Sequence, residues 1–137
     1  MDERIHRAML EQLDANGHLP CIRAHAIAQA LELPPLTVGL AATQADIRIS
    51  RCLLGLFGYG PKKEGKHKIV QPMEQVPEPL AVQLRAKAND RGITCAAIWE
   101  IADDMDYKRL EVSSAVEALG LKISHCQLGC FPRPWEG

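Results

Sequence analysis

The spacing of apolar residues along the chain predicts helices. Ile5, Met9 and Leu13 recur every fourth residue and would share one side of a helix. Later stretches show the same spacing, and proline, glycine or short polar turns separate them. The expected helices cover residues 2–15, 22–31, 36–45, 80–88, 96–105 and 109–119, and residues 121–123 alternate as a short strand. The pattern therefore predicts a mainly α fold.

The second half of the chain repeats the first. Residues 49–57, ISRCLLGLF, return as residues 123–131, ISHCQLGCF, with six of nine positions identical at an offset of 74. Further identities occur at the same offset along the preceding helices. Such repetition is typical of a duplicated supersecondary unit. We therefore expect two copies of one unit, in residues 1–74 and 75–137.

Each copy resembles the helix-turn-helix superfamily. Residues 26–43, AIAQALELPPLTVGLAAT, and residues 100–123, EIADDMDYKRLEVSSAVEALGLKI, place small and branched residues where that module packs its turn and its third helix. These residues are Ala28, Val38 and Ala41 in the first copy, and Ala102, Val112 and Ala115 in the second. The resemblance implies two tandem units of three helices and a short strand. It also implies that the third helices enter the major groove of double-stranded DNA.

The segment that follows the first copy adds a basic loop. Residues 56–57 and 69–70 can be two β arms, and the chain between them is rich in glycine and lysine. This arrangement resembles the wing of a winged-helix domain. We therefore expect a winged first unit with its basic wing at residues 58–70. The alternative is a solvated loop without a binding role.

Candidate DNA contacts come from the wing and from the last helix. Lysines in the wing would neutralise phosphates, while cations and hydroxyls at the start of residues 109–119 suit phosphates and base edges. The candidates are Lys62, Lys63, Lys66, Lys68, Lys108, Arg109, Ser113 and Ser114. Glu111 and Glu117 would repel DNA, and no Lys or Arg lies between Leu36 and Asp46 on the other third helix. The alternative is that both helices are solvated and only structural.

Composition and charge restrict the class of function. The 137 residues are 47% hydrophobic and 24% charged, as in a globular protein, and the net charge of −1 gives no general indication of nucleic-acid binding. No apolar run reaches the roughly 18 residues of a membrane span, and the N-terminus has no signal-peptide core. The glycines at 55, 58 and 60 lack the order and following helix of a phosphate loop. We expect a cytoplasmic protein with no membrane partner, no enzymatic activity and no cofactor.

The five cysteines divide into two kinds. Four align across the repeat, Cys21 with Cys95 and Cys52 with Cys126, and are expected to be small buried hydrophobes. Cys130 has no counterpart, and an odd number without an export signal argues against disulfides. Cys126, Cys130 and His125 form a C-x3-C group, a weaker pattern than the close pairs of structural zinc sites. We therefore expect no metal, and we keep these three residues as weak candidates for a metal site or a thiol switch.

These features favour a transcriptional regulator that binds double-stranded DNA, with a homodimer as a further expectation. One alternative is a tandem winged-helix module for protein–protein assembly. A second is a redox- or metal-responsive regulator that uses its cysteines. Trp135 is expected to fold back onto the second unit.

Overall fold

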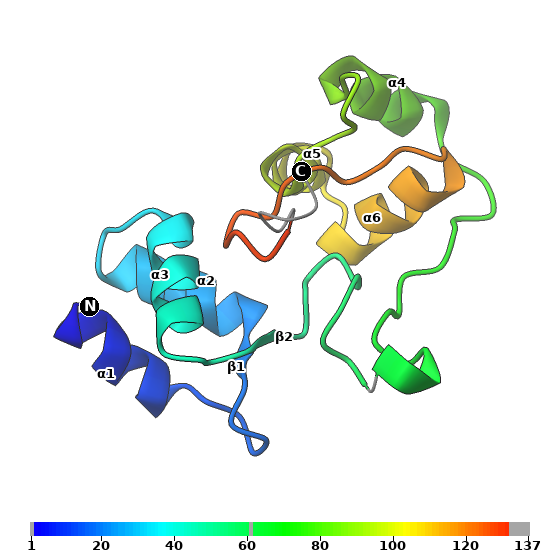
Figure 1. Ribbon diagram of the computed structural model, residues 1–137. Helices are drawn as coiled ribbons and strands as arrows, with labels where there is room; N and C mark the ends of the chain where they lie inside the picture. Colours follow the sequence, from blue (N-terminus) through cyan, green and yellow to red (C-terminus); the bar gives the residue numbers. More distant parts are fainter. Residues whose placement is uncertain (1, 61, 132–137) are drawn as a thin grey trace.

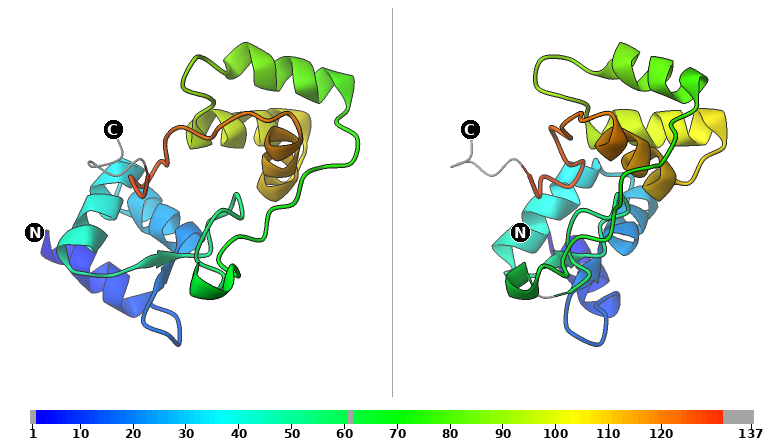
Figure 2. Two further views of the ribbon diagram at one scale, coloured as in Figure 1. Left: turned by 45° about the vertical axis from the view of Figure 1, so that its right-hand side comes forward. Right: turned by 90° about the vertical axis from the view of Figure 1, so that its right-hand side faces the viewer.

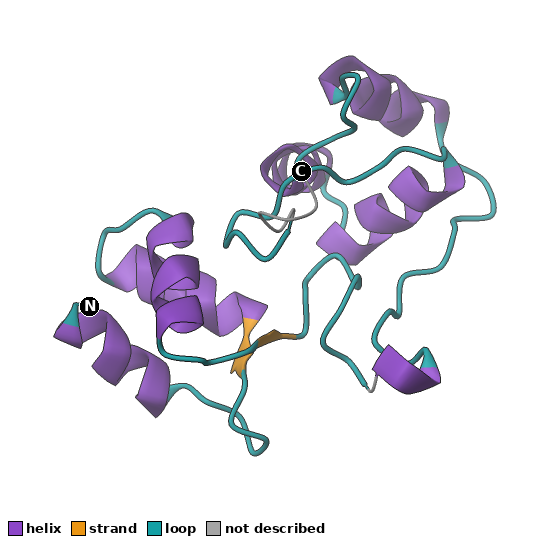
Figure 3. Ribbon diagram, viewed as in Figure 1, coloured by secondary structure: helices purple, strands orange, loops and turns teal. Residues whose placement is uncertain are grey.

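The computed structural model describes residues 2–60 and 62–131 and is mainly helical (Figures 1 and 3). Within these ranges the chain forms six α-helices, one short 3-10 helix and a parallel two-stranded sheet. In chain order these are α1 (Glu3–Glu11), β1 (Leu19–Pro20), α2 (Cys21–Ala30), α3 (Pro35–Gln44), β2 (Ile49–Ser50), the 3-10 helix (Lys62–Glu64), α4 (Glu78–Lys87), α5 (Cys95–Met105) and α6 (Arg109–Ala118). Trp135 lies outside the described residues.

The first helix is shorter than its apolar spacing predicts. Asp2 begins it by accepting the backbone N–H of Arg4 at 2.8 Å, which satisfies one of the free amides of the first turn. The helix ends at Glu11, not at residue 15. The Asp14 carboxylate accepts the N–H groups of Asn16 and His18, at 2.9 and 3.0 Å. This local bonding folds the next residues into a turn and competes with further helix.

The turns between successive helices are alike in the two halves. Glu32 has a φ of 56° between α2 and α3, and Asp106 has a φ of 60° between α5 and α6. In each turn the next residue donates its N–H to a carbonyl of the preceding helix, at 2.8 and 2.9 Å respectively. A left-handed residue followed by such a bond ends a helix sharply. The next helix therefore starts at the same distance along the chain in both halves.

Short parallel pairings close each half at the same offset. Leu19 of β1 pairs with Ile49 of β2 in the first half. In the second half Ile93 forms a parallel bridge with Ile123, and each of these two residues lies 74 positions after its counterpart in the first pair. Helices α3 and α6 also begin and end 74 residues apart. The strand expected over residues 121–123 is thus reduced to a single bridge, because only one residue of it finds a partner.

The two halves exchange loops. We call residues 51–57 the first exchanged loop and residues 125–131 the second. Leu54 lies in the core built by α4, α5 and α6, whereas Leu128 lies in the core built by α1, α2 and α3. The views in Figure 2 show the second loop returning from α6 toward α3. Each half therefore completes the hydrophobic core of the other.

Each exchanged loop also touches the third helix of the opposite half. Ser113 of α6 donates its hydroxyl hydrogen to the Leu54 carbonyl at 2.6 Å. At the equivalent position of α3 stands Gly39, where an added Cβ would overlap the Leu128 carbonyl. The lack of a side chain at Gly39 therefore allows the second loop to lie against the helix backbone.

The halves meet at a pair of rings. His25 of α2 and Trp99 of α5 occupy equivalent positions, and their ring centroids are 4.2 Å apart. Trp99 packs against both cores, and the Arg109 guanidinium lies 3.7 Å from its ring centroid. The contact is therefore a joint between halves as well as part of each core.

The prediction of two β arms for the wing is wrong. In the described chain neither residues 56–57 nor residues 69–70 form a strand. Both Ile69 and Val70 donate their N–H groups to the Gly55 carbonyl, at 2.8 and 3.2 Å. In a β ladder successive residues face opposite sides, so two adjacent amides on one carbonyl break the pairing. Residues 58–70 are instead an irregular excursion that contains the 3-10 helix.

Candidate functional site

The chain that follows the 3-10 helix of the first half passes beside α6 of the second half, while the 3-10 helix itself lies apart from α6 (Figure 1). Lys68 places its Nζ 2.8 Å from the Glu117 carboxylate of α6. Further along, Met73 donates its N–H to the Ser114 carbonyl at 3.0 Å. This placement follows from the exchange, because the first exchanged loop has already carried the chain onto the second half. Lys68 and Met73 therefore contact α6 although they are far from it in the sequence.

Three lysines of the basic segment 58–70, Lys63, Lys66 and Lys68, are exposed, and two of them have carboxylate neighbours. Lys66 lies 3.9 Å from Glu64, and Lys68 pairs with Glu117, while Lys63 is exposed as well. Lys62 begins the 3-10 helix, and its side chain is outside the described part. Exposed ion pairs contribute at most about 1 kcal/mol, so phosphates can compete for these lysines.

Both carboxylates of α6 that should repel DNA have partners. Glu111 accepts the backbone N–H of Lys108 at 2.9 Å, which closes the start of the helix. Glu117 is held by Lys68. Lys108 remains exposed immediately before the helix. Lys68 therefore offsets the charge of Glu117, whereas Glu111 keeps its negative charge at the exposed start of the helix.

Arg109 serves the contact between the halves. Its guanidinium covers Trp99 at 3.7 Å and lies 3.5 Å from Asp103, with its side chain 31% exposed. A cation over an aromatic ring is favourable, and more so when it is partly desolvated. Contact with a base would require the side chain to leave this position. Arg109 is thus positioned as a structural cation at the edge of the candidate DNA surface.

The serines expected at the DNA surface differ from each other. Ser113 is fully buried, and its hydroxyl donates a hydrogen bond to the Leu54 carbonyl. The expectation that Ser113 contacts DNA is therefore wrong, because its position on the helix faces the core. Of the predicted set, Lys63, Lys66, Lys68 and Lys108 are exposed and Ser114 is half-buried.

The equivalent helix of the first half has a different outer face. Leu36 and Leu40 of α3 are 47% and 55% exposed. No cation occurs on this helix to offset them. Phosphates gain nothing from such a face. The two third helices therefore differ in chemistry although they have the same backbone plan.

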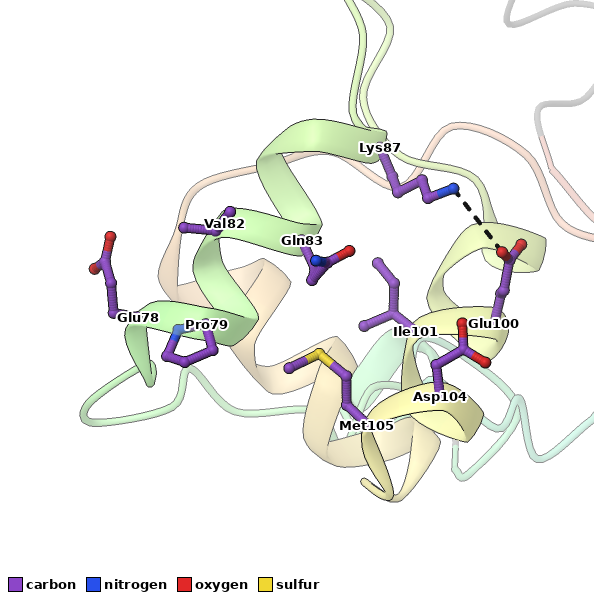
Figure 4. Close-up of a pocket in the computed structure, with 9 residues that line it drawn as sticks. All are labelled: Glu78, Pro79, Val82, Gln83, Lys87, Glu100, Ile101, Asp104 and Met105. Atoms are coloured by element: carbon purple, nitrogen blue, oxygen red, sulfur yellow. Dashed lines mark ion pairs between the residues drawn. The ribbon is translucent and has the colours of Figure 1, made fainter.

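A groove between α4 and α5 is apolar inside and mostly acidic at its rim (Figure 4). Ile101 and Met105 line it, and Glu78 and Asp104 border it. The Lys87 ammonium lies 3.9 Å from another rim carboxylate, that of Glu100. An excess of carboxylates repels phosphate, so this groove is not part of a DNA surface.

His25 is kept neutral at the joint. Burial lowers the pKa of His25 to about 4, and the nearby Arg109 charge acts in the same direction. Its Nε2 is buried without a hydrogen-bond partner among the described residues. A proton added there would be both desolvated and close to a guanidinium. The joint should therefore be sensitive to acid.

Four cysteines gather where the halves meet. Cys21 and Cys95 are the first residues of α2 and α5, whereas Cys52 and Cys126 lie in the exchanged loops. Burial raises the pKa of Cys21 to about 12 and that of Cys95 to about 11, and it also raises the pKa of Cys52. In each case negative charge on other cysteines of this set adds to the rise. Cys52 and Cys95 belong to the core of the second half, Cys21 and Cys126 pack in that of the first, and the Gln127 side chain, next to Cys126, donates to the Cys95 sulfur at 3.6 Å. These contacts connect the four cysteines across the two halves, and we call these four residues the cysteine centre.

Cys126, Cys130 and His125, the weak metal-site candidates from the sequence, are only partly brought together. The Cys130 thiol donates a hydrogen bond to Cys126, which lowers the pKa of Cys126 and raises that of Cys130. His125 is exposed and contributes its backbone carbonyl, which accepts the Cys95 N–H at 2.8 Å. Cys52 is buried as expected, but Cys126 is only half-buried. Among the described residues, no three His, Cys, Asp or Glu side chains are grouped so that they could hold one metal ion.

Comparison with family models, with curated proteins and with solved structures found no match for this chain. Function has to be inferred from the surfaces and side chains described above. Two features could not be expected from local sequence: the loop exchange and the convergence of Cys21, Cys52, Cys95 and Cys126. The one signal in the sequence was their alignment at the repeat offset, which is equally typical of core residues.

Proposed function

We propose that the protein is a transcriptional regulator that binds double-stranded DNA with α6 and residues 58–70. Two helices joined by a short turn are the basic pattern of helix-turn-helix modules. The helix pairs α2–α3 and α5–α6 both have this pattern, with a left-handed residue in each turn. In such modules the second helix of the pair enters the major groove. This supports a tandem helix-turn-helix arrangement in which α6 is the DNA-reading helix.

One observation carries the proposal, namely the contact of the basic segment with α6. The Lys68–Glu117 ion pair and the Met73–Ser114 backbone bond hold it there. A basic loop beside a reading helix can hold the phosphate backbone while the helix meets the groove. In this chain the loop comes from the first half and the helix from the second. Neither half alone would present the complete surface.

A binding assay with matched variants tests this proposal. The quadruple variant Lys62→Gln, Lys63→Gln, Lys66→Gln and Lys68→Gln should bind a labelled random-sequence duplex more weakly, whatever the sequence. Its binding should also depend less on salt, by up to about 0.9 in log–log slope for each phosphate that the variant no longer neutralises. Lys87→Gln with Lys122→Gln removes two exposed lysines outside this surface and should change neither quantity. Equal binding by parent and quadruple variant would contradict the proposal.

The outer face of α3 favours a second candidate, a protein–protein assembly module. Leu36 and Leu40 are exposed large apolar residues without a nearby cation on the helix. Exposed apolar side chains that cluster often mark an interaction surface. Sedimentation analysis of the parent and of Leu36→Ser with Leu40→Ser tests this. Self-association of the parent that the variant abolishes would support the candidate, including the expected homodimer. A monomeric parent over the micromolar range would count against self-assembly.

A further inference from the structure

The cysteine centre has a symmetry that ordinary core packing does not require. Each half supplies one cysteine at a helix start, Cys21 or Cys95, and one in its exchanged loop, Cys52 or Cys126. Cys52 packs in the core of the second half, and Cys126 packs against the core of the first. The exchange therefore places a loop cysteine of each half in the core that also holds the helix-start cysteine of the other half.

Hydrogen-bond donors are directed at two of the four sulfurs. The Cys126 Sγ accepts the Leu128 N–H at 3.4 Å, and the Cys95 Sγ accepts the Gln127 side-chain amide at 3.6 Å. A neutral thiol is only a weak acceptor. N–H donors on sulfur are typical of metal thiolates, whose electronic properties they adjust.

Helix position adds a further favourable contribution for thiolates. Cys21 and Cys95 are at the N-termini of α2 and α5, helices of 10 and 11 residues. The partial positive charge at a helix start stabilises a thiolate. The same residues are nevertheless buried, with 6% exposure each. Buried thiolates of this kind need a cation among them.

We propose that Cys21, Cys52, Cys95 and Cys126 are the thiolate ligands of an iron–sulfur cluster held between the two halves. A single tetrahedral ion would require all sulfurs at about 2.3 Å from one point. No three candidate ligands among the described residues are grouped for one ion. A cluster has several iron atoms of its own and connects cysteines that are further apart, and four cysteine ligands are its usual set.

The assembly of a 4Fe–4S cluster in the 2+ state balances without net oxidation or reduction when ferrous and ferric salts are supplied in equal amounts, because the cluster contains two Fe²⁺, two Fe³⁺ and four sulfide ions. Each of the four thiols loses its proton to solvent as its sulfur–iron bond forms. Iron salts and inorganic sulfide, added under anaerobic conditions, supply the remaining atoms. The N–H donors stay on the thiolate sulfurs after the bond has formed. Bound cluster would join the halves at a point where otherwise only loops and the Trp99–His25 contact join them.

Anaerobic reconstitution of the full chain with iron and sulfide tests the proposal. The parent should retain iron and acid-labile sulfide through desalting, with visible sulfur-to-iron charge-transfer absorption. Each of Cys21→Ser, Cys52→Ser, Cys95→Ser and Cys126→Ser should lose most of this absorption. Cys130→Ser removes the cysteine that has no counterpart in the first half and keeps a hydroxyl that can donate to Cys126 as the thiol does, so this variant should retain the cluster.

Variants with alanine separate loss of a ligand from loss of the fold. Alanine packs as a small apolar residue, so Cys52→Ala should keep the far-ultraviolet circular dichroism of the parent and still fail to retain iron. Retention of iron by folded Cys21→Ala or Cys52→Ala would overturn the proposal. Failure of the parent to retain any iron and sulfide would overturn it as well. A cobalt(II) spectrum of one tetrahedral four-thiolate ion, without cluster formation from iron and sulfide, would replace the cluster with a single-ion site.

Discussion

Gly39→Ala should destabilise the protein although it improves a helix. Gly39 lies inside α3, where alanine is favoured over glycine by about 1 kcal/mol. The added methyl would overlap the Leu128 carbonyl of the second exchanged loop. Backbone cannot move aside like the end of a flexible side chain, and overpacking costs about 1–3 kcal/mol. Displacement of the loop would also expose the buried Leu128 side chain, at a cost of about 1.5–3 kcal/mol.

The two costs less the helix gain give an expected net loss of about 1.5–5 kcal/mol in the free energy of unfolding. Urea titration followed by far-ultraviolet circular dichroism measures it. Gln44→Ala, at the exposed end of the same helix, is the control and should change stability by no more than about 0.5 kcal/mol. A displaced loop should also make Cys126 and Cys130 react faster with a thiol reagent. A Gly39→Ala protein that is as stable as the parent or more stable, with unchanged thiol reactivity, would refute the loop exchange.

Three further substitutions report on other contacts of the same architecture. Ser113→Ala should cost about 1–3 kcal/mol in urea titration, because the Leu54 carbonyl is left buried without a donor, whereas Ser114→Ala should be nearly neutral. Leu54→Ala and Leu128→Ala should each cost about 2–5 kcal/mol, and a negligible loss for either would show that its loop does not enter the opposite core. Because His25 has a pKa of about 4 in the folded chain, below its ordinary 6.5, the unfolded chain binds the proton first as pH falls. Stability should decline between about pH 6.5 and pH 4, and His25→Gln should flatten that decline by roughly 1–3 kcal/mol in urea titrations at several pH values; an unchanged pH profile would contradict the buried position of His25.

The helices were predictable because their signals are local. Apolar spacing located α2, α3, α5 and α6 to within a few residues of their bounds. Proline and the repeat offset located their starts. The first helix was predicted to continue to residue 15, but it ends at Glu11. Apolar spacing does not reveal the Asp14 turn, because that turn depends on side-chain hydrogen bonds. Element boundaries are where local patterns are weakest.

The loop exchange was not predictable, because either half could have accepted either loop. The sequences ISRCLLGLF and ISHCQLGCF are so alike that their apolar residues fit both cores. Ser113 shows the consequence. Its residue type suits a DNA contact, but the exchange brings the Leu54 carbonyl to its hydroxyl and makes it a core residue. Arg109 likewise suits a phosphate or base by residue type, but in the structure it covers Trp99 of its own half, the ring that meets His25 of the first half.

The most direct test of the proposed function is the salt dependence of DNA binding by the unmodified protein. Fluorescence anisotropy with a random-sequence duplex, repeated over a range of salt concentrations, gives the log–log slope. Each neutralised phosphate contributes about −0.9, so engagement of Lys63, Lys66, Lys68 and Lys108 predicts a slope of about −3 to −4. No binding at low salt, or a slope near zero, would contradict DNA binding by α6 and residues 58–70.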